Sequence, residues 1–284
     1  MGWREEWIER PQGRLRYVTA GSGPPLLLCH GFIGSAENFE GWVPRLAGRR
    51  RLVIPDLPGF GDSAPLPGAH TSRALAAELL ALLDQLEIGR YEVGGLCLGA
   101  AVALQLLGMA PQRVERMILH TPLLQPSMVT RPFRVQVRLG TAPGLFELIS
   151  YLGQRRVLAD LYRRVVVEGG ASVDRRSADV NFANQIRAHP RAAREWLVDG
   201  IREDFTALLD GWRGPVAVLA AGDDRILDLP RLAGYCASRP NTQLSVIESA
   251  GHGWDRELIR RQIDVLEGFL AEAQAAGDST APVT

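Results

Sequence analysis

Short apolar runs that end in glycine-containing turns are the feature of this 284-residue chain that most constrains its fold. Pro24–Cys29 ends at His30-Gly31, and Arg51–Pro55 ends at a turn that begins with Asp56. Runs this short, bounded by such turns, are typical of strands buried on both faces of a parallel sheet. Later runs of the same kind are Tyr91–Leu96, Val114–His120, Pro215–Ala221 and Gln243–Glu248.

Helical patterns alternate with these runs. The clearest is Thr71–Leu86, which opens with a threonine able to cap a helix and carries leucine and alanine at helical spacing. Repeated alternation of strand and helix predicts an α/β fold with a mostly parallel, doubly wound sheet and right-handed crossovers. The other expected helices are Gly41–Leu46, Gly99–Ala110 and Glu257–Gln274, and an opening hairpin is expected from Trp3–Ile8 and Arg14–Ala20.

One long stretch interrupts the alternation. Residues 123–205 show helical patterns and no convincing strand, which predicts an all-helical cap inserted after the sixth strand, over the C-terminal edge of the sheet. Arginines outnumber carboxylates in this stretch, and we interpret it as a solvated helical surface rather than an anion-binding lid. We therefore expect a core formed by residues 1–122 and 206–274, a cap formed by residues 123–205, and a disordered tail at residues 275–284.

Composition argues against several classes of partner and cofactor. The formal net charge is +0, so the total charge indicates neither nucleic acid nor an anionic membrane as a partner. No apolar run approaches the length of a membrane span, and the N-terminus shows no signal region, so we expect a cytoplasmic protein. The three cysteines are widely spaced, which fits a reduced interior, and none has a zinc-ligand spacing. We expect no metal and no cofactor, and the oligomeric state stays open.

The strongest chemical signal is Gly95-Leu96-Cys97-Leu98-Gly99, which lies between a predicted strand and a predicted helix. It has the pattern of a nucleophile elbow, G-x-S-x-G, with cysteine in place of serine. Glycines are needed there because the turn is sharp and side chains would collide with the neighbouring strand and helix. The sulfur of Cys97 would then lie at a helix N-terminus, which favours a thiolate. We predict Cys97 as the nucleophile.

Two loops after later strands carry candidate partners for this cysteine. His252 follows the last predicted strand on a glycine-flanked loop, from which an imidazole can reach a nucleophile on another strand. Asp223 and Asp224 follow the strand before it, where a carboxylate can accept a hydrogen bond from the far ring nitrogen of His252. The alternatives are a surface histidine and a plain acidic turn. We predict His252 as the base, oriented by an aspartate.

With these motifs the chain resembles the α/β-hydrolase superfamily, in the branch with a helical cap, over about residues 14–274. The order nucleophile, acid, histidine is the order that this fold uses. The family pattern favours Asp224 over Asp223 as the acid, because Asp224 directly precedes an Arg-Ile-Leu segment. The segments that carry the resemblance are Cys29-His30-Gly31-Phe32, Asp56 to Ser63, Gly95 to Gly99, Ala221 to Leu227 and Gly251-His252.

The resemblance also implies an oxyanion hole. Its donors would be the backbone N–H groups of Leu98, directly after the nucleophile, and of Phe32, after His-Gly. The resemblance further implies that the His30 side chain braces its own turn, and that Asp56 and Ser63 stabilise a turn beside the site. His120 ends a strand at the same edge, so we expect it to contribute to substrate binding, together with Trp254. Cys29 and Cys236 are expected to be inert buried thiols.

The cysteine at the elbow is a departure from the commonest pattern of the family, which has serine. Dienelactone hydrolases and polyhydroxyalkanoate synthases also have a cysteine there, so the substitution is compatible with activity, although this chain is short for a polymer synthase. An engineered replacement of serine by cysteine would give the same sequence and stays open. An aspartate at the elbow would have indicated dehalogenase or epoxide hydrolase chemistry, and position 97 is not an aspartate.

The sequence therefore predicts a cofactor-independent hydrolase of a small-molecule ester, lactone or thioester, acting through an acyl-thioester on Cys97. One alternative is an acyltransferase or cyclase that uses the same intermediate. A second alternative is a binding protein that kept the fold and lost turnover. The sequence does not identify the acyl substrate.

Overall fold

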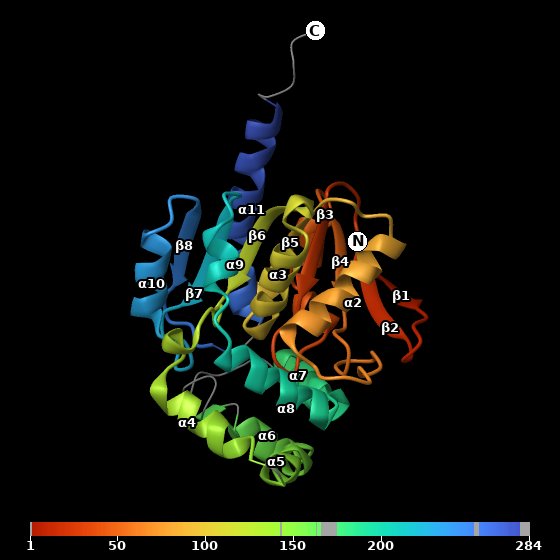
Figure 1. Cartoon of the computed structure of the whole chain (residues 1–284), viewed down its shortest axis with the longest axis vertical. Coiled ribbons are helices and arrows are strands. Elements are labelled where there is room, and N and C mark those ends of the chain that lie inside the picture. Colours follow the sequence, from red (N-terminus) through yellow and green to blue (C-terminus); the bar gives the residue numbers. More distant parts are fainter. Residues whose placement is uncertain (1, 143, 163, 166–174, 253–255, 279–284) are drawn as a thin grey trace.

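A computed structural model describes residues 2–142, 144–162, 164–165, 175–252 and 256–278. Its centre is an eight-stranded sheet with the order β1-β2-β4-β3-β5-β6-β7-β8 (Figure 1). β1 pairs antiparallel with β2, and β2 with β4, whereas all the other neighbours are parallel. The strands are β1 (Arg4–Ile8), β2 (Leu15–Ala20), β3 (Pro25–Cys29), β4 (Arg51–Pro55), β5 (Tyr91–Leu96), β6 (Val114–His120), β7 (Val216–Ala221) and β8 (Thr242–Ile247). The predicted α/β fold is confirmed.

The central strands are apolar throughout because helices cover both faces of the sheet. In β3, Leu26 and Leu28 face one layer while Leu27 and Cys29 face the other, as the two-residue period of a strand requires. One layer holds α2 (Ser72–Gln85), α3 (Leu98–Met109) and α10 (Leu229–Ala237), and the other holds α1 (Val43–Leu46) and α11 (Arg256–Asp278). The sheet is therefore the middle layer of three (Figure 1).

Helix boundaries differ from the expected ones by a few residues. Thr71 is the N-cap of α2, and its Oγ1 accepts a hydrogen bond from the N–H of Ala74 at 3.1 Å. α11 continues to Asp278, four residues beyond the expected end at Gln274, and residues 279–284 of the expected tail lie outside the described residues. Sequence patterns gave no signal for α9 (Thr206–Asp210), α10, or the 3₁₀ turns η1 (Ala36–Phe39), η2 (Pro111–Arg113) and η3 (Pro126–Met128).

Most of the chain between β6 and β7, as far as Arg202, forms a helical layer at one end of the sheet (Figure 1). Its helices are α4 (Arg131–Gly140), α5 (Leu145–Gly153), α6 (Arg156–Tyr162), α7 (Arg175–Arg187) and α8 (Pro190–Arg202). Within the described part of residues 123–205, the only strand-like pairing is an isolated bridge between Val129 and Leu227. A Cβ added to Gly200 of α8 would lie 2.5 Å from Leu98, so α8 packs directly onto the start of α3. None of the described helices has the length and apolar character needed to cross a membrane.

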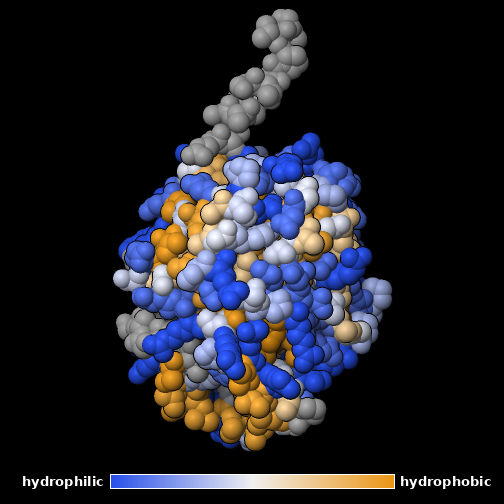
Figure 2. Space-filling model, turned by 60° about the vertical axis from the view of Figure 1, so that its left-hand side comes forward, coloured by the Kyte–Doolittle hydropathy of each residue, from blue (hydrophilic) through white to orange (hydrophobic). Residues whose placement is uncertain are grey.

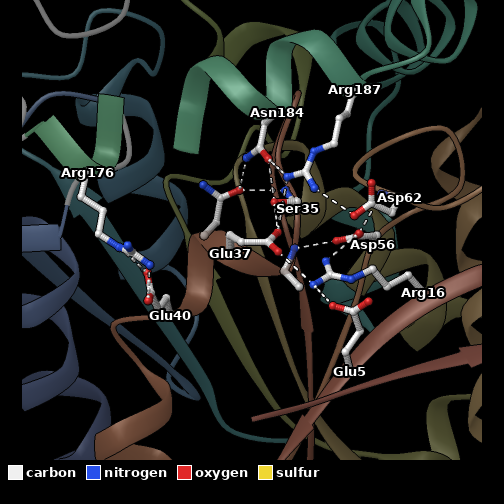
Figure 3. A network of polar contacts seen from close by, with 12 residues as sticks. Glu5, Arg16, Ser35, Glu37, Glu40, Asp56, Asp62, Arg176, Asn184 and Arg187 are labelled. Carbon is white, nitrogen blue, oxygen red and sulfur yellow. Dashed lines mark hydrogen bonds and ion pairs between the residues drawn. The ribbon is translucent and has the colours of Figure 1, made fainter. Parts of the chain in front are cut away.

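Polar side chains connect α7 to the loops that follow β3 and β4 (Figure 3). The buried Ser35 hydroxyl donates to the Asn184 side-chain oxygen at 2.7 Å, and Arg187 forms an ion pair with Asp62 at 2.9 Å. Below them, Asp56 accepts from the N–H of Ala36 at 2.8 Å and pairs with a buried Arg16 at 2.9 Å. The loop after β3 is thus held both by the sheet and by the cap.

Candidate active site

Cys97 lies in the sharp turn between β5 and α3, with φ 51° and ψ −114°. A non-glycine residue in this region of backbone space is strained, so the surrounding structure must hold it there. The close packing that requires glycine is visible at Gly95 and Gly99. A Cβ on Gly95 would lie 2.4 Å from the Gly99 carbonyl oxygen, and one on Gly99 would lie 2.4 Å from the carbonyl oxygens of Cys29 and His30. The turn holds Cys97, partly exposed, at the N-terminus of α3.

His252 follows β8 and reaches across to the turn. Its Nε2 lies 3.1 Å from the Cys97 Sγ. The imidazole is buried, with 8% of the residue exposed, while the thiol side remains partly accessible. The distance allows a direct proton transfer between sulfur and nitrogen.

Asp224 follows β7 and contacts the other side of the imidazole. The His252 Nδ1–H donates to the Asp224 Oδ2 at 2.7 Å. The second oxygen, Oδ1, accepts from the backbone N–H groups of Ile226 and Leu227, each at 2.8 Å. Asp223 is exposed, and its backbone N–H donates to the Ala250 carbonyl. Of the two neighbouring carboxylates, it is therefore Asp224 that the structure brings to His252.

These contacts set the charge balance of the site. Burial alone would lower the pKa of His252, but the carboxylate of Asp224 and the adjacent Cys97 raise that pKa well above its usual value. Burial opposes ionisation of Asp224 as well, yet the imidazole and the two backbone donors bring the pKa of this carboxyl below its usual value. These contacts therefore stabilise the imidazolium form of His252, which is the form that arises when its ring accepts a proton.

The turn after β3 packs against the elbow. A Cβ on Gly31 would lie 2.9 Å from the Leu96 carbonyl oxygen and 3.3 Å from the Cys97 Cβ. His30 fixes this turn, because its Nδ1–H donates to the Gly31 carbonyl at 2.8 Å and its Nε2 accepts from the Leu57 N–H at 2.9 Å. The backbone N–H groups of Phe32 and Leu98 donate to no acceptor among the described residues.

Of the two residues expected to bind substrate, the structure describes only His120. His120 is buried at the end of β6, where its Nε2 contacts the Gln262 side-chain amide of α11 and its carbonyl accepts from the Cys97 N–H at 2.8 Å. Burial and the neighbouring His252 lower the pKa of His120 to about 3, so its imidazole is neutral. Trp254 lies outside the described residues.

Several residues at this site carry no sequence motif. Gln262 is one, since it reaches His120 only because α11 crosses behind β6. Trp196 of α8 is another: it packs edge-on against Phe60 and His30, with ring centroids 5.1 Å and 6.3 Å away. The sequence shows that Trp196 lies on a helix, but it does not show which loop the side chain will contact.

Cys29 and Cys236 are both buried and unpaired. Burial raises the pKa of both, to about 11 for Cys236, which disfavours the reactive thiolate. Among the described residues, no group of three or more histidine, cysteine or acidic side chains is arranged to hold a metal ion.

The chain combines a three-layer α/β fold with a sharp turn between β5 and α3, next to which His252 pairs with Asp224. The family model of the alpha/beta hydrolase fold matches residues 24–253, and the chain belongs to this family. A 2-hydroxymuconate semialdehyde hydrolase of a Pseudomonas species is 27% identical over 94% of this chain and 93% of the relative. A soluble epoxide hydrolase of a Corynebacterium species is 27% identical over 91% of this chain and 94% of the relative.

Solved structures agree with this assignment at the level of the fold. A thermophilic esterase from Thermogutta terrifontis superimposes with a TM-score of 0.79 at 23% identity, covering 95% of this chain and 98% of the esterase. The named relatives and the family agree with the expectation of an α/β-hydrolase enzyme.

Proposed function

We propose that this protein is a cofactor-independent acyl hydrolase of the helical-cap branch of its family, in which Cys97 is the nucleophile, His252 the base and Asp224 the orienting acid. The observation that carries the proposal is the continuous series of contacts from the Cys97 Sγ to the His252 Nε2 at 3.1 Å, and from the His252 Nδ1 to the Asp224 Oδ2 at 2.7 Å. Ester, lactone and thioester are the substrate classes that this chemistry fits.

Acylation begins with transfer of the thiol proton of Cys97 to the His252 Nε2. The thiolate attacks the substrate carbonyl carbon, and the carbonyl electron pair moves to oxygen, where the N–H groups of Phe32 and Leu98 stabilise the negative charge. Collapse of this intermediate expels the alcohol or thiol, which takes the proton back from His252. Asp224 holds the imidazole in the required tautomer and stabilises its charged form. The acyl group is then a thioester on Cys97.

Deacylation reverses these roles with water as the nucleophile. His252 removes a proton from a water molecule, and the resulting hydroxide adds to the thioester carbonyl. Collapse of this intermediate breaks the carbon–sulfur bond and releases the acid, and the Cys97 sulfur takes the proton back from His252. No electron acceptor and no further co-reactant is needed. A cysteine in this position also distinguishes the chain from an epoxide hydrolase mechanism, which needs an aspartate at the elbow, despite the similarity to the Corynebacterium protein.

Acyl transfer or cyclisation is the second candidate, favoured by the packing of α8 on the elbow. A thioester exchanges readily with amines and thiols, and the close contact of Gly200 with Leu98 brings the cap directly over the start of α3. A cap in this position limits the access of water, and an acceptor other than water can then compete for the acyl group. Product analysis with and without added amines and thiols separates transfer from hydrolysis.

The test uses two cysteine variants. Cys97→Ala should lower turnover of a hydrolysed acyl substrate by at least about 10⁴-fold, because the covalent route is lost. The matched control, Cys236→Ala, removes a buried thiol on α10 and should retain turnover. Iodoacetamide should also alkylate Cys97 faster than a free thiol. Full activity in Cys97→Ala contradicts the mechanism, and a Cys97 no more reactive than a free thiol favours a non-catalytic binding protein.

A further inference from the structure

An unusual number of large apolar side chains is exposed on three cap helices. Of fifteen exposed large hydrophobic residues among the described ones, twelve lie between residues 135 and 165. Figure 2 shows orange side chains gathered at the cap end of the molecule. Single exposed apolar residues are common on soluble proteins, whereas a concentration of this kind marks an interaction surface. We use the name cap surface for the exposed large apolar side chains of α4, α5 and α6 together with the arginines of α4. The apolar members are Val135, Leu139, Leu145, Leu148, Ile149, Tyr151, Leu152, Val157, Leu158, Leu161 and Tyr162.

Helix α4 shows the organisation of this surface. Val135 and Leu139 point outward, and Leu139 is 63% exposed. Arg131, Arg134 and Arg138 are exposed on the same face, since these five positions repeat at intervals of three and four residues. The opposite face, which includes the buried Val137, packs inward. The outward face of α4 is therefore both apolar and basic.

Within the described part of the chain, the arginines of this face form no ion pair. In the described part of the chain, no carboxylate lies within ion-pair distance of Arg131, Arg134 or Arg138, and α4 itself has no acidic residue. The two carboxylates on α5 and α6 have other partners. Glu147 accepts from the Gly144 N–H at 2.8 Å, and Asp160 pairs with Arg156 at 3.5 Å.

This combination disfavours a second copy of the chain as the occupant. A two-fold contact would bring the same surface of both copies together and oppose unpaired arginines to unpaired arginines. A partner of the cap surface must cover apolar side chains and also supply negative charge. An anionic lipid surface does both, because its headgroups pair with guanidinium groups while the acyl boundary accepts the aliphatic side chains. Exposed leucine, valine and tyrosine beside arginine is the composition of helices that lie in the plane of such an interface.

We propose that the cap surface docks the protein reversibly on anionic lipid bilayers, with α4, α5 and α6 in the interface. The protein would lie on the membrane rather than across it, and none of the helices among the described residues is long and apolar enough to span. The elbow turn faces the cap end of the sheet, so docking brings the side of the molecule that contains Cys97 toward the lipid (Figure 1). This inference does not depend on the acyl chemistry proposed above.

Vesicle flotation of the full chain tests the proposal. Wild type should float with vesicles that contain phosphatidylglycerol, should bind much less to phosphatidylcholine alone, and should lose binding as salt rises. Arg134→Glu/Arg138→Glu should weaken binding by at least about tenfold. Arg49→Glu/Arg213→Glu is the matched control, because both residues are exposed at the opposite edge of the sheet, just before β4 and β7.

A second pair of variants tests the apolar contribution. Leu139→Ser/Val157→Ser should weaken binding to the same vesicles, whereas Val246→Ser, an exposed position on β8, should not. All these substitutions are at exposed positions, and circular dichroism verifies that each variant is folded. The proposal is overturned if wild type fails to bind phosphatidylglycerol vesicles or binds both vesicle types equally. Two further results would overturn the proposal. One is a wild-type dimer in sedimentation that Leu139→Ser/Val157→Ser dissociates. The other is binding of an acidic protein, but not of lipid vesicles, that Arg134→Glu/Arg138→Glu abolishes.

Discussion

Asp223 and Asp224 are neighbours in sequence with different surroundings, and they provide a sharp test at the scale of single residues. Asp224→Asn should lower turnover by on the order of a thousandfold, because an amide cannot stabilise the imidazolium of His252 and favours the wrong tautomer. Asp223→Asn, at an exposed position, should stay within about twofold of wild type. Steady-state kinetics with one acyl substrate checks both variants. Equal losses in the two would contradict the assignment of the acid.

The His252–Asp224 pair also predicts how stability depends on pH. The folded pKa of His252 is raised, so its contribution is fully present below the unfolded value of about 6.5 and is lost as pH rises through the folded pKa. The pKa of Asp224 is lowered, so the carboxylate contributes until pH falls through that lowered value. The difference in free energy of unfolding between wild type and Asp224→Asn should therefore be largest between about pH 4 and 6.5. Urea unfolding across this range measures it, and a difference that grows above pH 7 would show the opposite linkage.

Among single residues, those with a sequence motif were the ones that could be located before the structure. Cys97 is marked by flanking glycines, and His252 and Asp224 by loops that follow predicted strands. Gln262 and Trp196 have no such mark, because their contacts with His120 and His30 depend on how two helices cross the sheet. The catalytic and substrate-binding roles assigned to these residues stay predictions, and Trp254 lies outside the described residues.

At the scale of elements, the elbow depends on the absence of side chains between β3, β5 and α3. Gly99→Ala should destabilise the fold by more than about 2 kcal/mol, because the new Cβ meets backbone carbonyl oxygens that cannot rotate away. Gly234→Ala, inside α10 with no atom within 4 Å of the added Cβ, should stabilise by about 0.5–1 kcal/mol. Urea midpoints decide this, and a neutral effect of Gly99→Ala would contradict the packing described for the turn.

Element types were predicted well where periodicity was strong. All eight strands were expected within a few residues. The strands β2 to β7 are mostly buried, and short apolar runs of this kind have a clear pattern. Helix α10 is not expected from the sequence, because Pro230 and Gly234 both weaken a helical pattern. The segment is helical in the structure, where Leu232 and Cys236 pack against the core. The cap contacts through Ser35 and Asn184 join residues far apart in sequence, which no local pattern can show.

At the scale of the whole molecule, the net charge of the chain gives no sign of the basic and apolar cap surface. A formal net charge of +0 predicts no anionic partner, yet three arginines of α4 are unpaired among the described residues and lie beside exposed aliphatic side chains. Charges elsewhere in the chain balance this local excess without being near it. The expectation of no membrane partner and the docking proposal give opposite results in vesicle flotation.

Whole-molecule similarity identifies the family but not the substrate. The relatives include a semialdehyde hydrolase and an epoxide hydrolase on the same architecture, so one fold carries different reactions. In this chain the elbow position holds a cysteine, whose Sγ contacts His252, and His252 in turn contacts Asp224. The central claim is therefore that an acyl group passes through a thioester on Cys97.

The most direct test of that claim is the intact mass of the protein after brief exposure to a panel of acyl esters, lactones and acyl thioesters. Wild type should gain the mass of one acyl group, and Cys97→Ala should gain none. Decay of the adduct in water alone indicates a hydrolase, and decay only with an added acceptor indicates a transferase. Turnover that proceeds equally in both proteins, or an acyl mass that appears on Cys97→Ala as well, would contradict the account.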